Sequence, residues 1–388
     1  MSIDIKDVFK KYFMVFALVV VIIIFQAATG GKMLLPQNVN NLISQNAYVF
    51  VLAAGMLLCI LTGGNIDLAV GSVVCFIGAI GAVMMDKDIS MIFAVVVMLI
   101  GGLLVGAWQG FWIAYLKVPP FIATLAGMYA FRGLSNVVLQ GFAVGIRNEK
   151  FLFIFGGGAD CYIPDLFKGN GINLTCVLAG VILVAVYVFT VIKGRISAKK
   201  AGYTVESLGP VIIKMLIISA AVIAFFVKLA QYKGIPTSLI WIGLVLVAYA
   251  YITSNTTMGR YLYAVGGNEK ATALSGVDPR KVYFFAYVNM GLMAGLAGIL
   301  NTARLTQAQP TFGQGYEMDA IAACFIGGAS AYGGEGSIFG IVIGALLMGV
   351  INMGMSILGV DANFQKVVKG LVVLFAIIFD VLSSKKKQ

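Results

Sequence analysis

Apolar segments of about 20 residues recur along the whole chain, and they constrain its fold more than any other feature. A helix needs about 20 apolar residues to cross the hydrocarbon core of a bilayer, whereas outer-membrane strands alternate over about ten. The sequence therefore predicts an all-α integral membrane protein, a polytopic bundle of about 10–12 transmembrane helices. The predicted spans are 12–29, 47–62, 66–85, 91–116, 121–140, 173–193, 209–229, 236–254, 282–301, 318–333, 337–358 and 366–383.

Two of these segments, 47–62 and 318–333, are short for a helix that crosses the bilayer. A tilted, a broken or a re-entrant helix would fit either of them. Composition supports the membrane class, because 60% of the residues are hydrophobic and 11% are charged. An ordinary soluble domain is about 45–50% apolar and about 25% charged, so a soluble fold could not bury this much apolar surface.

The formal net charge of +11 indicates topology and not nucleic-acid binding, because the basic residues gather at the ends of spans. With twelve spans, all four basic clusters fall on one side of the membrane, and the positive-inside rule makes that side cytoplasmic. Both termini are then cytoplasmic. The opposite loops are acidic or mixed. The clusters are 6–11, 193–200, 260–281 and 385–387.

Several kinds of chemistry find no support in the sequence. Histidine is absent, no metal-ligand cluster is evident and no phosphate-binding GxxxxGK[ST] loop occurs. We therefore expect no cofactor, no metal and no ATPase or other enzyme site in this chain. Cys161 and Cys176 flank a polar loop, and their spacing alone does not decide whether they form a disulfide.

Three polar interruptions of the apolar pattern are candidates for a transport path. In the first, 62–72, Asp67 stands at the start of a span, where capping of the helix is the favoured role. In the second, Pro119 and Pro120 precede a span that carries Arg132, and a charge there must face protein or water. A polar pathway and a buried pair with a carboxylate such as Asp67 would both satisfy it.

The third interruption, 303–330, is rich in Gly and Gln and runs into a short apolar helix. Glu317 and Asp319 fall in the first turn of that helix, where the helix dipole favours negative charge, so at least one of them is expected to cap it. Irregular backbone at membrane depth is tolerated only inside protein or beside water. The path candidates are Asn65, Asp67, Ser72, Thr124, Arg132, Arg304, Gln309, Glu317 and Asp319.

Residues 259–281 form the longest charged, helix-capable stretch between two spans. Asn268 to Leu274 can form a short helix that Gly276 and Pro279 would end. A plain solvated loop need not be this long or this regular in charge. We therefore interpret the stretch as a contact surface for another protein on the cytoplasmic side.

Taken together, these segments resemble the permease subunit of bacterial ABC importers for ribose, xylose, arabinose and galactose. The matching motifs are GGNIDLAVGS at 63–72, VPPFIATL at 118–125, GRYLYAVGGNEKATALSGV at 259–277, GYEMDAIAACFIGGAS at 315–330 and FQKVVKG at 364–370. The chain departs from the family at Asn65, where glycine is frequent, and at Ala69, where serine is frequent. It also carries an inserted segment, 194–235, with one extra span, as the xylose and multiple-monosaccharide permeases do.

The resemblance implies a single permease domain over 1–388, placed as a multi-pass protein in the bacterial inner membrane. Two copies would form the path, a cytoplasmic ATP-binding cassette protein would bind the ATP, and a periplasmic sugar-binding protein would deliver the substrate. The segment 259–281 would be the ATPase-docking loop. The docking positions carried over from the family motif are Gly266, Gly267, Asn268, Glu269, Lys270, Ala271, Leu274, Ser275 and Gly276.

Other functions stay open at this point. The same architecture would suit another polar solute, such as a nucleoside. An ion-coupled secondary transporter is the alternative from a different class. Such transporters place ionisable groups near the bilayer midplane, whereas the carboxylates of this chain are predicted at span ends, which argues against ion coupling.

Overall fold

The computed structural model describes residues 5–167, 169, 171–203, 205 and 207–385, and it confirms an all-α protein. Its helices are α1 (Ile5–Ala28), α2 (Pro36–Gln45), α3 (Ala47–Leu61), α4 (Val70–Asp86), α5 (Met91–Ala114), α6 (Pro120–Leu139), α7 (Glu149–Phe155), α8 (Leu174–Lys200), α9 (Leu208–Ala230), α10 (Thr237–Asn255), α11 (Thr257–Gly267), α12 (Glu269–Leu274), α13 (Pro279–Leu305), α14 (Tyr316–Ile326), α15 (Ile338–Ile357) and α16 (Ala362–Lys385).

A helix occupies every predicted span, but the helices differ in length. Within the described residues, seven are long and apolar enough to cross a membrane, or eight if α2 and α3, bent by 42°, form one broken span. The predicted span 318–333 is wrong in extent, because α14 has 11 residues and ends at Ile326. Glycines at 327, 328, 333, 334 and 336 explain the early end, since four of the five adopt positive φ angles.

The chain divides into two compact units. The larger comprises 1–33, 42–161 and 238–388, and the smaller comprises 34–41 and 162–237. In the smaller unit, α8 and α9 pack closely, because the Cα of Gly180 lies against the Phe226 side chain. The Cys176 thiol donates to the Phe226 carbonyl oxygen at 3.3 Å within this unit.

The larger unit is built around α3, all of whose residues are buried. Helix α13 packs against α3, α4 and α5. Glycines allow the closest of these contacts: a Cβ on Gly102 of α5 would lie 2.5 Å from the Gly291 carbonyl oxygen of α13. Small residues thus let the backbones of α5 and α13 approach closely within the chain.

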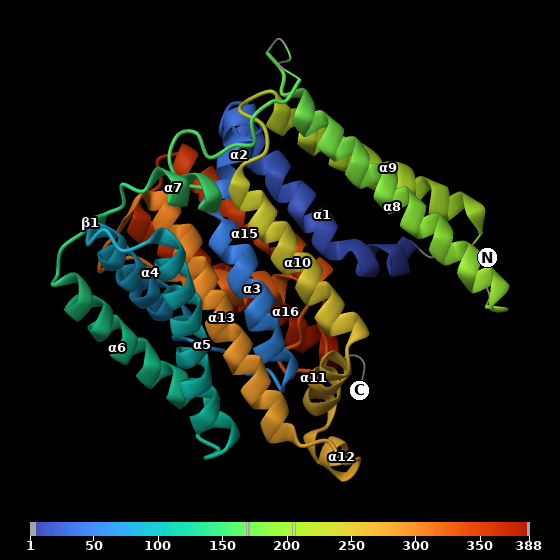
Figure 1. Ribbon diagram of the computed structural model, residues 1–388. Helices are drawn as coiled ribbons and strands as arrows, with labels where there is room; N and C mark the ends of the chain where they lie inside the picture. The colour runs from blue at the N-terminus through green and yellow to red at the C-terminus, as the bar shows by residue number, and fades with distance from the viewer. Residues whose placement is uncertain (1–4, 168, 170, 204, 206, 386–388) are drawn as a thin grey trace. The chain divides into compact units, whose positions relative to one another are not determined.

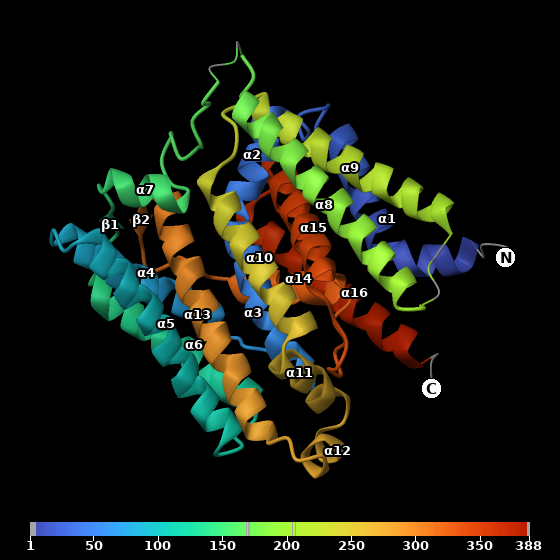
Figure 2. The same cartoon turned by 45° about the vertical axis from the view of Figure 1, so that its right-hand side comes forward.

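The two ends of the larger unit carry different structures. A two-residue strand, β1 (Val144–Gly145), pairs antiparallel with β2 (Gln307–Ala308) near α7 at one end. Helices α11 and α12 lie at the other, and α13 runs from one end to the other (Figure 1). The turned view in Figure 2 shows the same separation. We call the α11–α12 end the docking end.

The four basic clusters are only partly described. The side chains of Lys6, Lys10 and Lys11, and residues 386–388 entirely, lie outside the described part of the chain. The cytoplasmic location of both termini therefore stays a prediction.

Candidate functional site

An irregular segment, 306–315, enters the bundle beside α4 and leads into α14. Thr306, with a φ of 54°, ends α13, and β2 follows it. Cys75 of α4 then donates to the Gln309 carbonyl oxygen at 3.5 Å. Further along, Gly313 and Gly71 touch through their backbones, and a Cβ on either would overlap the carbonyl oxygen of the other. Only glycine fits at this crossing.

Arg132 of α6 holds this segment in place. Its Nη1 donates to the carbonyl oxygens of Pro310, at 3.1 Å, and Phe312. Asp67 accepts a different donor, the Ala69 backbone N–H, at 2.8 Å. Arg132 thus holds the backbone of segment 306–315. Its charge also attracts the nearby Glu317 carboxylate.

A second irregular segment, 62–69, runs back along α3 before α4 begins. Its glycines, Gly63 and Gly64, have φ angles of 113° and 74° and reverse the chain after Leu61. The Asp67 backbone N–H then reaches the sulfur of Met56, which lies more than one turn before the end of α3. The hydrogen bond from Ala69 makes Asp67 the first residue of an Asx turn that precedes α4. The N-cap of α4 is Ala69 and no side-chain hydrogen bond caps the helix, so the favoured capping role of Asp67 is wrong.

Glu317 and Asp319 begin α14 as predicted, but their roles differ. Glu317 lies in the first turn of α14, where the helix dipole favours its negative charge, but the N-cap, Gly315, makes no side-chain cap hydrogen bond. Asp319 is fully buried and pairs with Lys369 of α16, whose Nζ lies 2.9 Å from Oδ1 and 3.0 Å from Oδ2. The expected position of Asp319 at a helix end is confirmed, but its buried ion pair with Lys369 was not predicted.

A network of polar side chains extends from this ion pair. The Tyr48 hydroxyl of α3 donates to Asp319 Oδ2 at 2.6 Å. The Tyr48 ring stacks on that of Tyr316, with centroids 3.7 Å apart, and Tyr316 donates to Asn301 Oδ1 at 2.7 Å. Four helices, α3, α13, α14 and α16, meet here. Lys369, the second lysine in FQKVVKG, was the one signal for this network in the sequence.

The other path candidates are spread over several places. The Thr124 hydroxyl donates to the Pro120 carbonyl oxygen within α6, and Ser72 is buried in the first turn of α4. Arg304 acts electrostatically on Tyr316, and the Gln309 side chain donates to Thr311. Asn65 lies at the docking end, where its Nδ2 donates to the Thr62 carbonyl oxygen at 3.1 Å. The structure thus gathers Arg132, Arg304, Gln309, Glu317 and Asp319 around 306–319, and leaves Asn65 and Thr124 apart from them.

The predicted docking helix is present as α12. Asn268 caps it by accepting the Ala271 backbone N–H at 2.9 Å, and it ends before Gly276, whose φ is 90°. Leu274, at its end, is 90% exposed. The other docking candidates are exposed as well, except for the half-buried Gly266: Gly267, Asn268, Glu269, Lys270, Ala271, Ser275 and Gly276.

Arg280 has a local partner beyond α12. Its Nε lies 3.1 Å from Asp278 Oδ1. The hydrogen bond from this guanidinium holds the pKa of the Asp278 carboxyl below its usual value. Arg280 therefore closes the turn into α13.

At the docking end, backbone contacts connect α11 with the segment before α4 and with the glycine-rich segment before α15. Gly266 of α11 lies against the Leu61 carbonyl oxygen, which also accepts the Gly334 backbone N–H at 3.0 Å. The Tyr263 hydroxyl donates to the Gly336 carbonyl oxygen at 2.9 Å. The segments before α4 and before α15 thus touch the same short helix.

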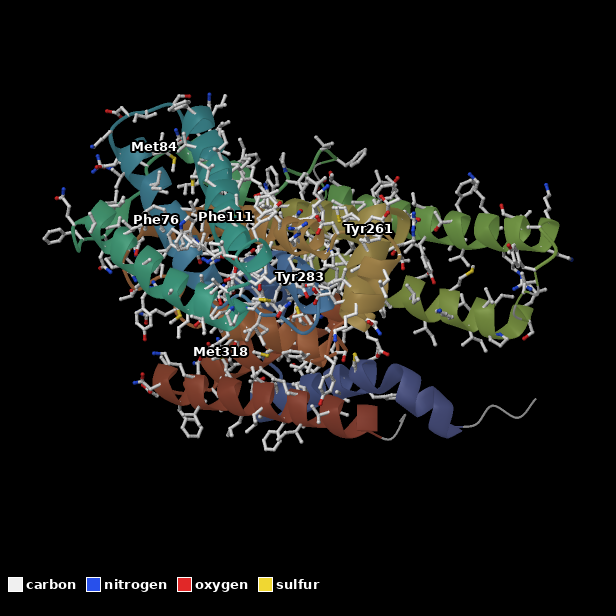
Figure 3. All side chains as sticks on the ribbon, turned by 90° about the horizontal axis from the view of Figure 1, so that it is seen from below. Phe76, Met84, Phe111, Tyr261, Tyr283 and Met318 are labelled. Carbon is white, nitrogen blue, oxygen red and sulfur yellow. The ribbon has the colours of Figure 1, made fainter. Side chains whose placement is uncertain are left out.

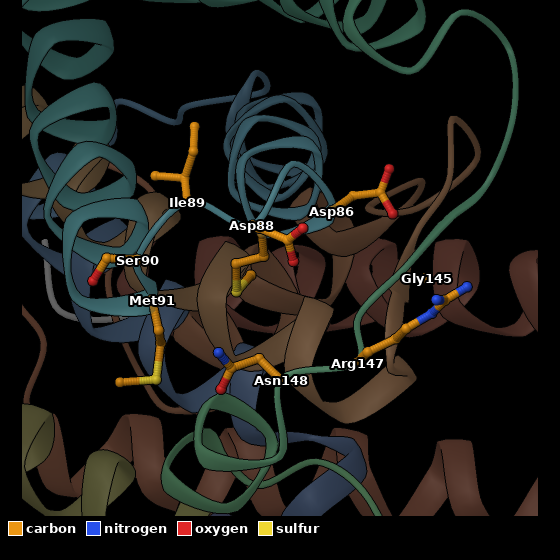
Figure 4. A pocket seen from close by; sticks show the side chains of 9 residues that line it. Asp86, Asp88, Ile89, Ser90, Met91, Gly145, Arg147 and Asn148 are labelled. Carbon is orange, nitrogen blue, oxygen red and sulfur yellow. The ribbon is translucent and has the colours of Figure 1, made fainter.

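A polar pocket of about 390 Å³ lies at the opposite end of the larger unit. The turn between α4 and α5 and the segment 145–148 line it. Figure 4 shows Asp86, Asp88, Arg147 and Asn148 around this space. It lies between two loops that the charge pattern places outside the cytoplasm.

Comparison with known proteins gives a consistent result. A family described as branched-chain amino acid transport system / permease component matches residues 38–377. The xylose transport system permease protein of Haemophilus influenzae is 35% identical over 381 residues, 97% of each chain. Its counterpart in Escherichia coli K12 is 33% identical over 97% of this chain and 93% of its own. The ribose import permease protein of Escherichia coli K12 is 35% identical over 351 residues, 90% of this chain and 86% of its own. No solved structure matches.

Proposed function

Because the chain belongs to the family of branched-chain amino acid transport system permease components, a family of multi-pass inner-membrane proteins, we propose that it is the membrane-spanning subunit of an ATP-driven importer for a monosaccharide. The observation that carries the substrate class is the similarity, at 33–35% identity over 90–97% of the chain, to permeases named for xylose and ribose. The family description itself names amino acids, and these relatives narrow the class to sugars.

The energy would come from a separate ATP-binding cassette protein in the cytoplasm. The chain carries no phosphate-binding loop motif of its own. Helix α12 presents the exposed Leu274 beside the charged Glu269 and Lys270, a combination suited to a protein partner. Gly266 of the adjoining helix α11 contacts Leu61 and Gly334, which links the docking end to the segments before α4 and before α15.

The path would run beside the two irregular segments, 62–69 and 306–315. Their backbone lies outside regular helix, and such irregular backbone at membrane depth is tolerated beside a water-filled path, where a neutral polyol could form weak, repeated hydrogen bonds. A second copy of the chain would complete this path. A periplasmic sugar-binding protein would dock at the end opposite α12, where the pocket between Asp88 and Arg147 offers both signs of charge.

One observation favours the ion-coupled alternative. Asp319 and Lys369 form a buried ion pair among helices, and such pairs occur in proton and ion pathways. In this chain, however, the hydroxyl of Tyr48 and the Lys369 ammonium already occupy the carboxylate. We therefore assign the pair to holding α14 and α16 together.

A substrate panel tests the assignment to sugars. The chain would be reconstituted with the ATPase and the binding protein encoded beside it, and uptake of labelled xylose, ribose, leucine and adenosine would be compared in the presence of ATP. We expect accumulation of a pentose, with competition only by other monosaccharides. Accumulation of leucine or adenosine in place of the pentoses would refute the sugar assignment and leave the importer architecture standing.

A further inference from the structure

A series of side-chain contacts joins the docking helix to the irregular segment before α4. The Tyr283 hydroxyl, on the first turns of α13, donates to Glu269 Oε2 of α12 at 3.1 Å. The Asn65 side chain lies beside the same hydroxyl group. A Cβ on Gly63 would lie 3.9 Å from both Asn65 Nδ2 and the Tyr283 hydroxyl oxygen, so the two groups meet over that glycine.

The Tyr283 hydroxyl stands between a charged acceptor and an amide side chain. It donates to the Glu269 carboxylate, whose charge strengthens this bond. On its other side lies Asn65, whose Nδ2 donates to the Thr62 carbonyl oxygen and so ties the side chain to the backbone that follows α3.

The position of Tyr283 indicates a role other than binding the partner protein. Glu269 is exposed on α12, whereas Tyr283 is partly buried on the rigid helix α13. In Figure 3, seen from the docking end, Tyr283 lies in projection between Phe111 and Tyr261, toward the middle of the bundle. A partner bound to α12 would reach the Glu269 side chain first and segment 62–69 only through contacts such as this one.

We propose that Tyr283 is a positioning residue through which a displacement of α12 is transmitted to segment 62–69 and the start of α4. Glu269 moves with the bound partner, whereas Tyr283 keeps a fixed position on α13. Asn65 then positions the backbone that leads to Asp67 and α4. This inference rests on the proposed function, because it assumes that a hydrolysing partner binds α12. It adds to that function the residue that couples ATP hydrolysis to sugar transport.

The test is the number of sugars moved per ATP hydrolysed. Tyr283→Phe keeps the ring on α13 and removes the hydroxyl, so the reconstituted complex should still bind and hydrolyse ATP within about twofold of the unchanged protein. Uptake should fall about tenfold, as expected when a charge-assisted hydrogen bond is lost, and the transport ratio should fall with it. Asn65→Val should lower the ratio similarly, because it changes the side chain on the other side of the Tyr283 hydroxyl.

Tyr249→Phe is the matched control. It also removes a tyrosine hydroxyl, which donates to Asn289 between α10 and α13 at 3.2 Å, but it has no link to α12. Its ratio should match that of the unchanged protein.

The outcomes separate the two hypotheses. An unchanged ratio in both Tyr283→Phe and Asn65→Val would overturn the role of Tyr283 while ATP-driven uptake by the unchanged protein still upheld the proposed function. A parallel loss of hydrolysis and uptake would also overturn it, because Tyr283 would then act in docking or folding. Failure of the unchanged protein to couple uptake to ATP would refute the proposed function instead.

Discussion

Lys369→Met should destabilise the protein by about 3–5 kcal/mol, the range expected when one partner of a buried ion pair is removed. The Asp319 carboxylate is fully buried between α3, α14 and α16, and the Tyr48 hydroxyl alone would remain to solvate it. Thermal unfolding of the purified protein in detergent measures the effect. Sugar uptake should fall with it, because α14 loses its attachment to α16.

The double variant Asp319→Asn with Lys369→Met separates charge from packing. It leaves no uncompensated charge, and the asparagine amide oxygen can still accept the Tyr48 hydroxyl, so it should regain most of the lost stability. Lys366→Met, on the same helix, is the control and should stay near the unchanged protein. A Lys369→Met variant as stable as the unchanged protein would show that the ion pair does not hold α14.

Leu274→Asp should abolish most of the binding to the ATPase, weakening it about 30-fold or more. A side chain that is 90% exposed has no packing role within the chain, and a buried apolar anchor at an interface contributes about 2 kcal/mol or more. Affinity for the purified ATPase, measured with the permease in nanodiscs, gives the result directly. Uptake and ATPase stimulation should decline in parallel.

Tyr203→Asp is the matched control for this variant. Tyr203 is 72% exposed in the loop after α8, which the charge pattern also places in the cytoplasm, but it lies outside α11 and α12. It should leave affinity and thermal stability unchanged. If Leu274→Asp bound the ATPase as tightly as Tyr203→Asp does, α12 would not be the docking surface.

Sequence patterns predicted the parts of this fold that depend on interactions between residues close together in the chain. Apolar segments located the spans, and Asn268 and Gly276 delimited α12 to within a residue because capping and positive φ are properties of short sequences. Segment 327–336 showed the opposite case. The predicted span continued to residue 333, but α14 ends at Ile326, where a run of glycines that mostly adopt positive φ begins.

The candidate site depended more on long-range contacts, which the sequence could not supply. Arg132 was recognisable as a charge within a span, yet its partners are carbonyl oxygens about 180 residues further along. Lys369 pairs with Asp319 across 50 residues, and no local pattern distinguishes it from a lysine at a span end. Tyr48 and Tyr283 looked like ordinary aromatic residues until their hydroxyl partners were known.

The energy source of uptake tests the central claim most directly. The chain would be placed in liposomes with its binding protein, with or without the ATPase, and pentose accumulation would be followed under either internal ATP or an imposed proton gradient. We predict accumulation above the outside concentration only when the ATPase and ATP are both present. Accumulation driven by the proton gradient in liposomes that contain the chain without the ATPase would contradict the claim and assign the buried Asp319–Lys369 pair to ion coupling.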